Sequence, residues 1–160
     1  MPALTRIISG GQTGADQGGL EAATKLRVST GGWMPHGFLT ETGLRSEFAR
    51  LYDMRERPES EYAPRTEANV RESDGTVIFG DVGSIGSRNT KEFCAKHGKP
   101  RYLIPWRSGG SIPAATGVEF LRWLEDHNIR ILNVAGNREG VQPGIQRAVR
   151  EFLIAALRPR

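Results

Sequence analysis

Five glycines between residues 10 and 19 constrain the fold of this chain more than any other feature of its sequence. They follow an apolar run over residues 4–9 and precede a helical pattern over residues 15–26. A strand that passes through glycines into a helix exposes backbone N–H groups at the helix N-terminus, where the helix dipole is positive. This arrangement predicts a loop that binds phosphate or another anion.

Short apolar runs alternate with helical patterns along the rest of the chain. We predict five strands, at residues 4–9, 28–34, 76–79, 101–105 and 129–134. Helices are predicted at 15–26, 66–73 and 90–97, after a capping box of Thr116 and Glu119, and after Pro143 and Gly144. The alternation predicts one domain over residues 1–160, an α/β doubly wound, Rossmann-like three-layer fold. Its sheet would be mostly parallel and five-stranded, in the order 2-1-3-4-5.

The first glycine-rich loop does not match the common nucleotide-binding motifs. The dinucleotide pattern G-x-G-x-x-G and the Lys of a P-loop are both missing. Asp16 is placed either to stabilise the start of its helix or to contact a ligand hydroxyl or a metal, for which Asp81 could be a second Mg²⁺ ligand. If the glycines do more than make tight turns, the loop supplies these ligand-binding residues: Gly10, Gly11, Gln12, Thr13, Gly14 and Asp16.

A second loop, over residues 80–90, repeats the sequence of strand, glycines, hydroxyls and helix start. In the predicted strand order the two loops face each other across the crevice where such sheets bind ligands. Arg88 is the nearest cation for a phosphate, although Ser87, Asn89 or Thr90 could serve only to cap the helix. The predicted binding residues here are Asp81, Gly83, Ser84, Gly86, Ser87, Arg88, Asn89 and Thr90.

Three further regions are open to two interpretations. Gly32 lies in a sharp turn that we include in the binding site, and the adjacent Trp33 either stacks on a heterocycle or packs in the core, which we favour. Arg65 and Asn69 could face the crevice, as could Thr66, which is also a candidate N-cap. The polar segment 37–64 is longer than an ordinary connection, which predicts a functional lid or disorder.

Composition and charge narrow the class of partner. The net charge of +4 divides into −2 over residues 1–80 (9 basic, 11 acidic) and +6 over residues 81–160 (13 basic, 7 acidic). The basic residues are scattered, which favours attraction of a small anion over a nucleic-acid groove. The chain has no apolar run long enough for a membrane span, one cysteine and three separated histidines. We therefore expect a cytoplasmic protein with no protein-built metal site.

Six motifs together resemble the putative molybdenum carrier family, whose members are similar to molybdenum-cofactor carrier proteins. The motifs occupy residues 10–16, 31–37, 65–70, 73–76, 86–90 and 132–139. The resemblance implies a Rossmann-like nucleotide-binding fold related to lysine-decarboxylase-like proteins. It also implies a carrier of molybdenum cofactor (molybdopterin) or of another nucleotide-like phosphate ligand. Its partners would be that ligand, molybdoenzymes and further copies of the chain as a homo-oligomer, with neither nucleic acid nor a membrane.

An enzyme is the alternative. Residues 86–93 are similar to the G-G-x-G-T-x-x-E motif of nucleoside-monophosphate phosphoribohydrolases, but Phe93 stands where that motif has its catalytic Glu. Glu92 is one residue away, a rotation of about 100° around a helix. We therefore predict binding rather than catalysis and assign no catalytic residue. Cys94 is expected to be a buried small side chain, with a role as molybdenum ligand as the alternative.

Overall fold

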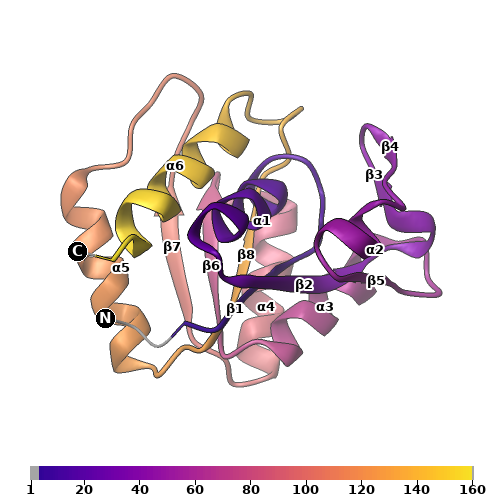
Figure 1. Cartoon of the computed structure of the whole chain (residues 1–160), viewed down its shortest axis with the longest axis horizontal. Coiled ribbons are helices and arrows are strands. Elements are labelled where there is room, and N and C mark those ends of the chain that lie inside the picture. The colour runs from indigo at the N-terminus through magenta and orange to yellow at the C-terminus, as the bar shows by residue number, and fades with distance from the viewer. Residues whose placement is uncertain (1–3, 160) are drawn as a thin grey trace.

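A computed structural model describes residues 4–159 and confirms the α/β class (Figure 1). Six strands of the described chain form one sheet with the order β5-β2-β1-β8-β6-β7, in which every neighbouring pair is parallel. The strands are β1 (Arg6–Ser9), β2 (Ser29–Met34), β5 (Met54–Glu56), β6 (Gly75–Gly80), β7 (Arg101–Pro105) and β8 (Ile131–Gly136).

Two predictions about the sheet are wrong. It has a sixth strand, β5, inside the segment expected to be a lid or disordered, and the order 2-1-3-4-5 is replaced by one in which the last strand lies between β1 and β6. Every residue of β6 is buried, while Arg101 and Pro105 of β7 are exposed, so β7 forms the edge of the sheet. The placement of β8 separates the two glycine-rich loops and brings a third loop between them.

Helices cover both faces of the sheet. On one face lie α1 (Ala15–Leu26), α5 (Ala114–Asp126) and α6 (Ile145–Leu157), and on the other lie α3 (Tyr62–Glu72) and α4 (Ile85–Lys96). The main core includes Ile7, Phe79 and Leu132 from the strands, with Phe120 and Leu153 from the helices. Burying the apolar stripes of the helices against the sheet is what stabilises such layers.

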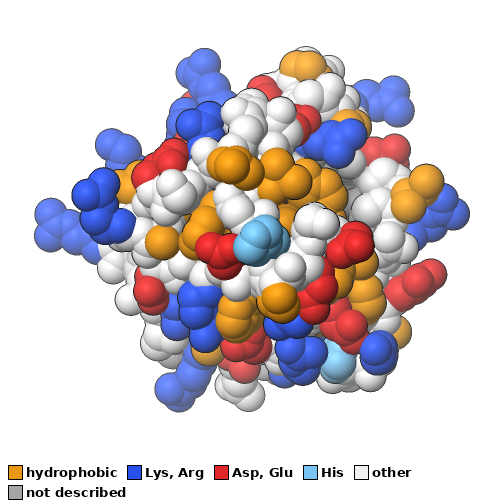
Figure 2. Space-filling model, turned by 90° about the vertical axis from the view of Figure 1, so that its right-hand side faces the viewer, with side chains coloured by type: hydrophobic (Ala, Val, Ile, Leu, Met, Phe, Trp, Pro, Cys, Tyr) orange, Lys and Arg blue, Asp and Glu red, His pale blue; other side chains and the backbone are white. Residues whose placement is uncertain are grey.

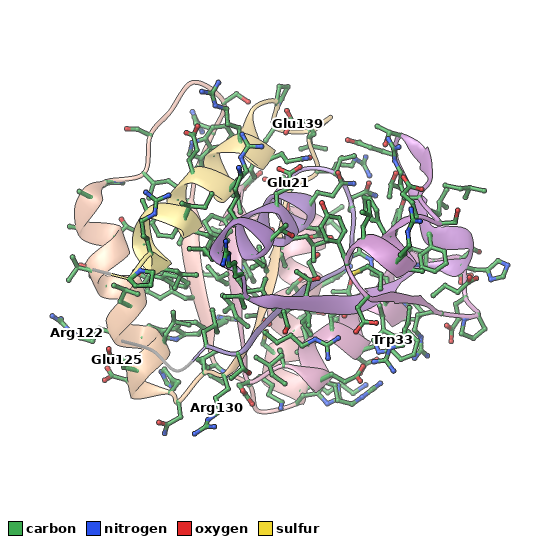
Figure 3. All side chains as sticks on the ribbon, viewed as in Figure 1. Glu21, Trp33, Arg122, Glu125, Arg130 and Glu139 are labelled. Atoms are coloured by element: carbon green, nitrogen blue, oxygen red, sulfur yellow. The ribbon has the colours of Figure 1, made fainter. Side chains whose placement is uncertain are left out.

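The predicted bounds of α1 are confirmed, whereas other helix starts are corrected. Thr116 lies inside α5, whose N-cap is Pro113 without a side-chain hydrogen bond, so the predicted capping box does not form. Thr66 is likewise inside α3, where its hydroxyl donates to the Tyr62 carbonyl over 3.0 Å. Ser84 caps α4 by accepting a hydrogen bond from the Ser87 N–H over 3.3 Å. Glu139 accepts hydrogen bonds from two N–H groups at the start of α6 (Figure 3).

Segment 37–64 is a folded attachment to the sheet. It contains the short helix η1 (His36–Phe38), the hairpin β3 (Leu39–Thr40) and β4 (Gly43–Leu44), helix α2 (Phe48–Leu51) and strand β5. A second cluster of apolar side chains holds it, formed by Leu20, Met34, Phe38, Phe48 and Met54. Viewed from the side of these elements, basic and acidic side chains alternate around small apolar areas (Figure 2). This face therefore carries no single-sign charged stripe.

Candidate functional site

A pocket of about 380 Å³ opens at the carboxyl ends of the parallel strands. This is the edge at which α/β sheets bind ligands, and the volume is within the range of small-molecule sites. Four segments line the pocket: the first glycine-rich loop, the first half of α3, the start of α4 and the end of β8 with the loop that follows. The two glycine-rich loops therefore share one pocket, as predicted, although β8 lies between their strands.

Eight of the predicted binding residues line this pocket and seven do not. Those that line it are Gly10, Gln12, Asp16, Ser84, Gly86, Ser87, Asn89 and Thr90. Those outside its lining are Gly11, Thr13, Gly14, Gly32, Asp81, Gly83 and Arg88. Arg88 is exposed on the outer side of α4, and Gly32 packs so tightly that an added Cβ would lie 2.1 Å from the Ser9 carbonyl oxygen.

The backbone donors of the first loop are engaged inside the protein. The N–H of Gly11 donates to Ser9 Oγ, that of Gln12 to Asp16 Oδ2 and that of Thr13 to Gln12 Oε1, over 3.0 to 3.3 Å. The next two N–H groups donate to the Gln146 side chain and to the Asn137 carbonyl. The expected open anion site is therefore missing from this loop. Its donors stabilise the loop itself.

Gly14 has a steric reason to be glycine. Its φ of +83° is one that other residues adopt only with strain, and an added Cβ would lie 2.4 Å from the Asn137 carbonyl oxygen. The first loop and the loop after β8 thus lie so close together that no side chain fits at this position.

The start of α4 leaves N–H donors open. Among the described residues, none accepts a hydrogen bond from the N–H groups of Ile85 and Gly86, which both belong to the pocket lining. An ideal Cβ built on Gly86 meets no atom within 4 Å, so this residue is uncovered on its Cβ side. Ser87 and Thr90 are almost completely buried in the lining, and the Thr90 hydroxyl already donates to the Gly86 carbonyl over 3.0 Å. Open N–H groups at the N-terminus of a twelve-residue helix favour an anion.

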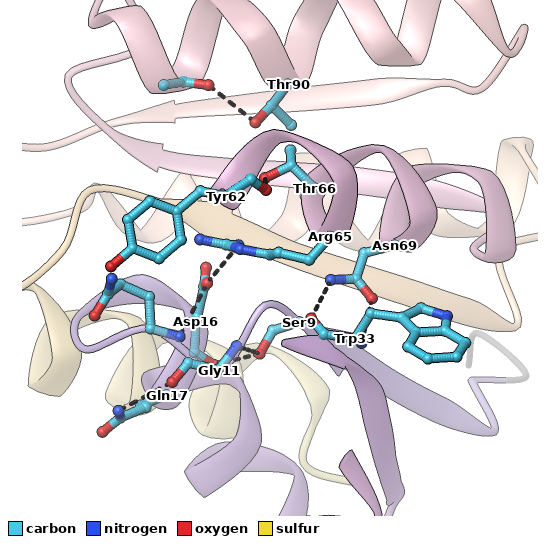
Figure 4. Close-up of polar contacts among 12 residues, drawn as sticks. Ser9, Gly11, Asp16, Gln17, Trp33, Tyr62, Arg65, Thr66, Asn69 and Thr90 are labelled. Carbon is cyan, nitrogen blue, oxygen red and sulfur yellow. Dashed lines mark hydrogen bonds and ion pairs between the residues drawn. The ribbon is translucent and has the colours of Figure 1, made fainter. Parts of the chain in front are cut away.

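Asp16 and Arg65 form a buried ion pair on the opposite wall (Figure 4). Arg65 Nη1 lies 3.2 Å from Asp16 Oδ2, and their side chains are 13% and 5% exposed. The Arg65 guanidinium stands 5.2 Å from the centre of the Tyr62 ring. Gly10 makes room for the pair, since an added Cβ there would lie 1.7 Å from Arg65 Nη1. The Arg65 side chain thus lies in the pocket wall, between the Tyr62 ring and the first loop.

Burial raises the pKa of the Asp16 carboxyl from 3.8 to about 6, although Arg65 and the N–H of Gln12 act in the opposite direction. Loss of hydration is the largest cause, because it disfavours the charged form. Arg65 Nε is also buried, and no described residue accepts its hydrogen bond. A buried donor without a partner costs about 1–3 kcal/mol. The pair therefore includes one buried N–H group without a partner.

Asn137 joins the three loops at the sheet edge. Its Oδ1 accepts a hydrogen bond from the N–H of Asp81 over 2.6 Å, its Nδ2 lies 3.4 Å from Ser84 Oγ, and its carbonyl accepts from the N–H of Ala15 over 3.1 Å. Our sequence reasoning placed Asn137 only in a family motif, not in the site, and it missed Tyr62, Arg138 and Val141 as lining residues. The position of β8 explains the omission of Asn137, Arg138 and Val141, because this loop was not expected between the other two, whereas Tyr62 enters the lining because α3 begins four residues earlier than predicted.

Glu41, in the turn between β3 and β4, attaches the hairpin to the rim of the pocket. Its carboxylate accepts hydrogen bonds from the Thr13 hydroxyl and, over 2.8 Å, from the N–H of Gly140. It also pairs with Arg138 Nε at 3.2 Å, and its own N–H donates to Gln12 Oε1 over 2.8 Å. Two of these partners, Gln12 and Arg138, line the pocket.

Asn69 lines the pocket, as the sequence had allowed, and it holds Trp33, which lies outside the lining. Asn69 brackets the Trp33 backbone, with Oδ1 accepting from its N–H and Nδ2 donating to its carbonyl. The Trp33 ring is neither in the pocket lining nor in a buried cluster, which corrects the prediction that it packs in the core. It points outward and stacks under Arg55, whose guanidinium lies 4.1 Å from the ring centre (Figure 3).

Cys94 is 1% exposed and absent from the pocket lining, and burial raises the pKa of its thiol. This confirms the expectation of a buried small side chain. Within residues 4–159, no three His, Cys, Asp or Glu side chains group in a way that could hold a metal ion. No helix of that part of the chain is long and apolar enough to cross a membrane. Phe93 faces the pocket, whereas Glu92 is exposed outside it.

Comparisons with known proteins agree with the fold. Residues 7–157 match the circularly permutated YpsA SLOG family. A crystal structure described as a putative molybdenum carrier protein from Syntrophus aciditrophicus SB is 36% identical in sequence, with a TM-score of 0.86. The match covers 99% of this chain and 97% of the other. A search of curated proteins returned no significant match.

Proposed function

We propose that this chain, which belongs to the circularly permutated YpsA SLOG family, binds and carries a phosphorylated heterocycle in the pocket at the sheet edge. The observation that carries the proposal is the open N-terminus of α4 inside that pocket. The candidate ligands are molybdenum cofactor and a related nucleotide-like molecule. The description of the similar structure as a molybdenum carrier supports a carrier role.

The phosphate would bind at the start of α4. The N–H groups of Ile85 and Gly86 and the Ser87 hydroxyl are suited to donate to its oxygens. The positive end of the helix dipole adds attraction in a partly enclosed space. Arg138, on the neighbouring rim, contributes positive charge that Glu41 partly balances.

The heterocycle would lie between the Tyr62 side of the pocket and Phe93. Aromatic side chains suit a flat ring. These residues fit the phosphate and the ring system of molybdopterin as well as those of a nucleotide. Molybdenum would then arrive as cargo on the ligand.

Hydrolysis of a nucleoside monophosphate is the less favoured function. Phe93 occupies the pocket position at which the related enzymes have a carboxylate, and Glu92 lies outside the lining.

The carrier would work in the cytoplasm as a homo-oligomer and deliver its ligand to molybdoenzymes.

Native mass spectrometry of the protein purified without added ligand tests the ligand class directly. A retained mass of molybdopterin or of a nucleotide is expected. Calorimetric titration with guanosine monophosphate should then give binding that Gly86→Asp weakens at least about tenfold, because a carboxylate would occupy the phosphate position. Gly86→Asn is the matched control without charge. Equal affinity in wild type and Gly86→Asp would refute the proposed phosphate position.

A further inference from the structure

The pocket runs from the edge of the sheet back between α3 and α4, which both start at this edge. Along β8 its lining extends from Gly136 to Asn133, and along α4 from Ile85 to Phe93. With about 3.3 Å per strand residue and about 1.5 Å per helix residue, these walls are about 10 to 12 Å long. Asn133, Phe93 and Asn69 therefore form the deep end of the pocket, and the start of α4 lies at its mouth.

Asn133 has a polar atom without a partner at this deep end. It alternates with Leu132 and Val134, which pack in the main core on the opposite face of the sheet, so its side chain faces α3 and α4. Its Nδ2 donates to Thr76 Oγ1 over 3.2 Å, and no described residue donates a hydrogen bond to its Oδ1. The residue is only 3% exposed.

The free oxygen of Asn133 is open to the pocket. Among the described buried side-chain nitrogen and oxygen atoms, only Arg65 Nε is both without a partner and closed off from the surface. Asn133 Oδ1 has no partner either, so it retains accessible surface, and the pocket is the space that this residue lines. Asn69 has no such free atom, because its Oδ1 and Nδ2 both bind the Trp33 backbone. Asn133 Oδ1 is therefore an acceptor presented to a ligand.

The deep end selects a neutral donor. The charged residues of the described lining are Asp16, Arg65 and Arg138. Asp16 and Arg65 lie in the first turns of α1 and α3 and pair with each other at 3.2 Å, and Arg138 lies beyond the end of β8. All three are thus nearer the mouth than Asn133. A neutral N–H group on a flat ring suits the Asn133 oxygen and the Phe93 ring at the same depth.

We propose that Asn133 Oδ1 accepts a hydrogen bond from an amino group on the heterocycle, so that the pocket selects amino-substituted rings. This inference rests on the proposed function, because it assigns the ring end of the same pocket. Adenine and guanine each carry an amino group that donates hydrogen bonds. An unsubstituted purine joined to ribose has no N–H donor on its ring, so it would leave the buried oxygen unpaired and lose affinity. Asn133 is then the residue that determines specificity for the ring.

Calorimetry with the monophosphates of adenosine, guanosine and purine riboside tests the proposal. At least one of the two amino nucleotides should bind at least about tenfold more tightly than purine riboside monophosphate. In Asn133→Leu, which is similar in size but has no acceptor, this preference should fall to near one. Gly86→Asn, at the phosphate end of the pocket, is the control and should retain the preference.

The outcomes separate this inference from the proposed function. If the three nucleotides bind equally and Gly86→Asp weakens them all, the phosphate position stands and the role of Asn133 is overturned. Retention of the preference in Asn133→Leu would overturn it as well. If no nucleotide binds, both proposals fail for mononucleotides. Should Asn133→Leu not fold by circular dichroism, Asn133→Ala takes its place with the same expected result.

Discussion

Replacing Asp16 by asparagine should change how the stability of this protein depends on pH. The pKa of this carboxyl is about 6 in the folded protein and 3.8 without the fold, so the folded state binds the proton more tightly. Stability therefore increases as pH falls from 7 to 5, and the contribution is lost as pH rises through 6. With about 1.4 kcal/mol per pKa unit, the gain between pH 7 and pH 5 is about 1 kcal/mol.

The measurement is urea unfolding followed by tryptophan fluorescence at pH 7, 6 and 5. The wild-type protein should gain about 1 kcal/mol over this range, and Asp16→Asn should lose that gain because it has no proton to bind. Asp126→Asn, at the exposed end of α5, is the control and should follow the wild type. Identical pH dependence in wild type and Asp16→Asn would refute the assignment of a buried, destabilised carboxylate.

Other acidic residues contribute to the pH dependence of stability in a different pH range. Hydrogen bonds from basic side chains lower the pKa of Glu59, Glu67 and Glu151 below 4.5. Their stabilisation is present above that pH and is lost only as pH falls through the lowered values. Among the carboxyl groups with shifted pKa values, Asp16 is therefore the one whose contribution to stability changes between pH 7 and pH 5.

Two further substitutions test the loops around the pocket. Glu41→Gln removes the ion pair with Arg138, so we expect a loss of stability of at most about 1 kcal/mol. Amide hydrogen exchange over residues 39–44, measured by mass spectrometry, should become faster. Unchanged exchange would argue against attachment of the hairpin by this carboxylate. Asn137→Ala leaves the N–H of Asp81 without its acceptor, so we expect the free energy of unfolding in urea to fall by about 1–3 kcal/mol. A decrease smaller than the error of the method would contradict the bridging role of Asn137.

Local patterns in the sequence determined the elements and the end of the sheet at which the pocket lies. The helix over Ala15–Leu26 has clear apolar periodicity and a glycine-rich start, and it was predicted with its bounds. Alternation of strands and helices was sufficient for the α/β class, because parallel strands need crossover helices. All parallel strands end at the same edge, so the loops at residues 10–16 and 84–90 meet in one pocket.

Only the tertiary structure decided the strand order and, with it, the chemistry of the pocket walls. An apolar run such as 129–134 fits the centre or the edge of a sheet equally well. The pattern of apolar residues indicates which side chains are buried, but it does not indicate which strands lie next to each other. The insertion of β8 brought Asn137 between the two glycine-rich loops. Folding also paired Asp16 with Arg65, which is 49 residues away in the sequence. The backbone N–H groups of the first loop found acceptors within the protein, on Ser9 and Gln12. The glycines at residues 10–14 thus predicted the place of the site, whereas long-range hydrogen bonding left its open donors at the start of α4.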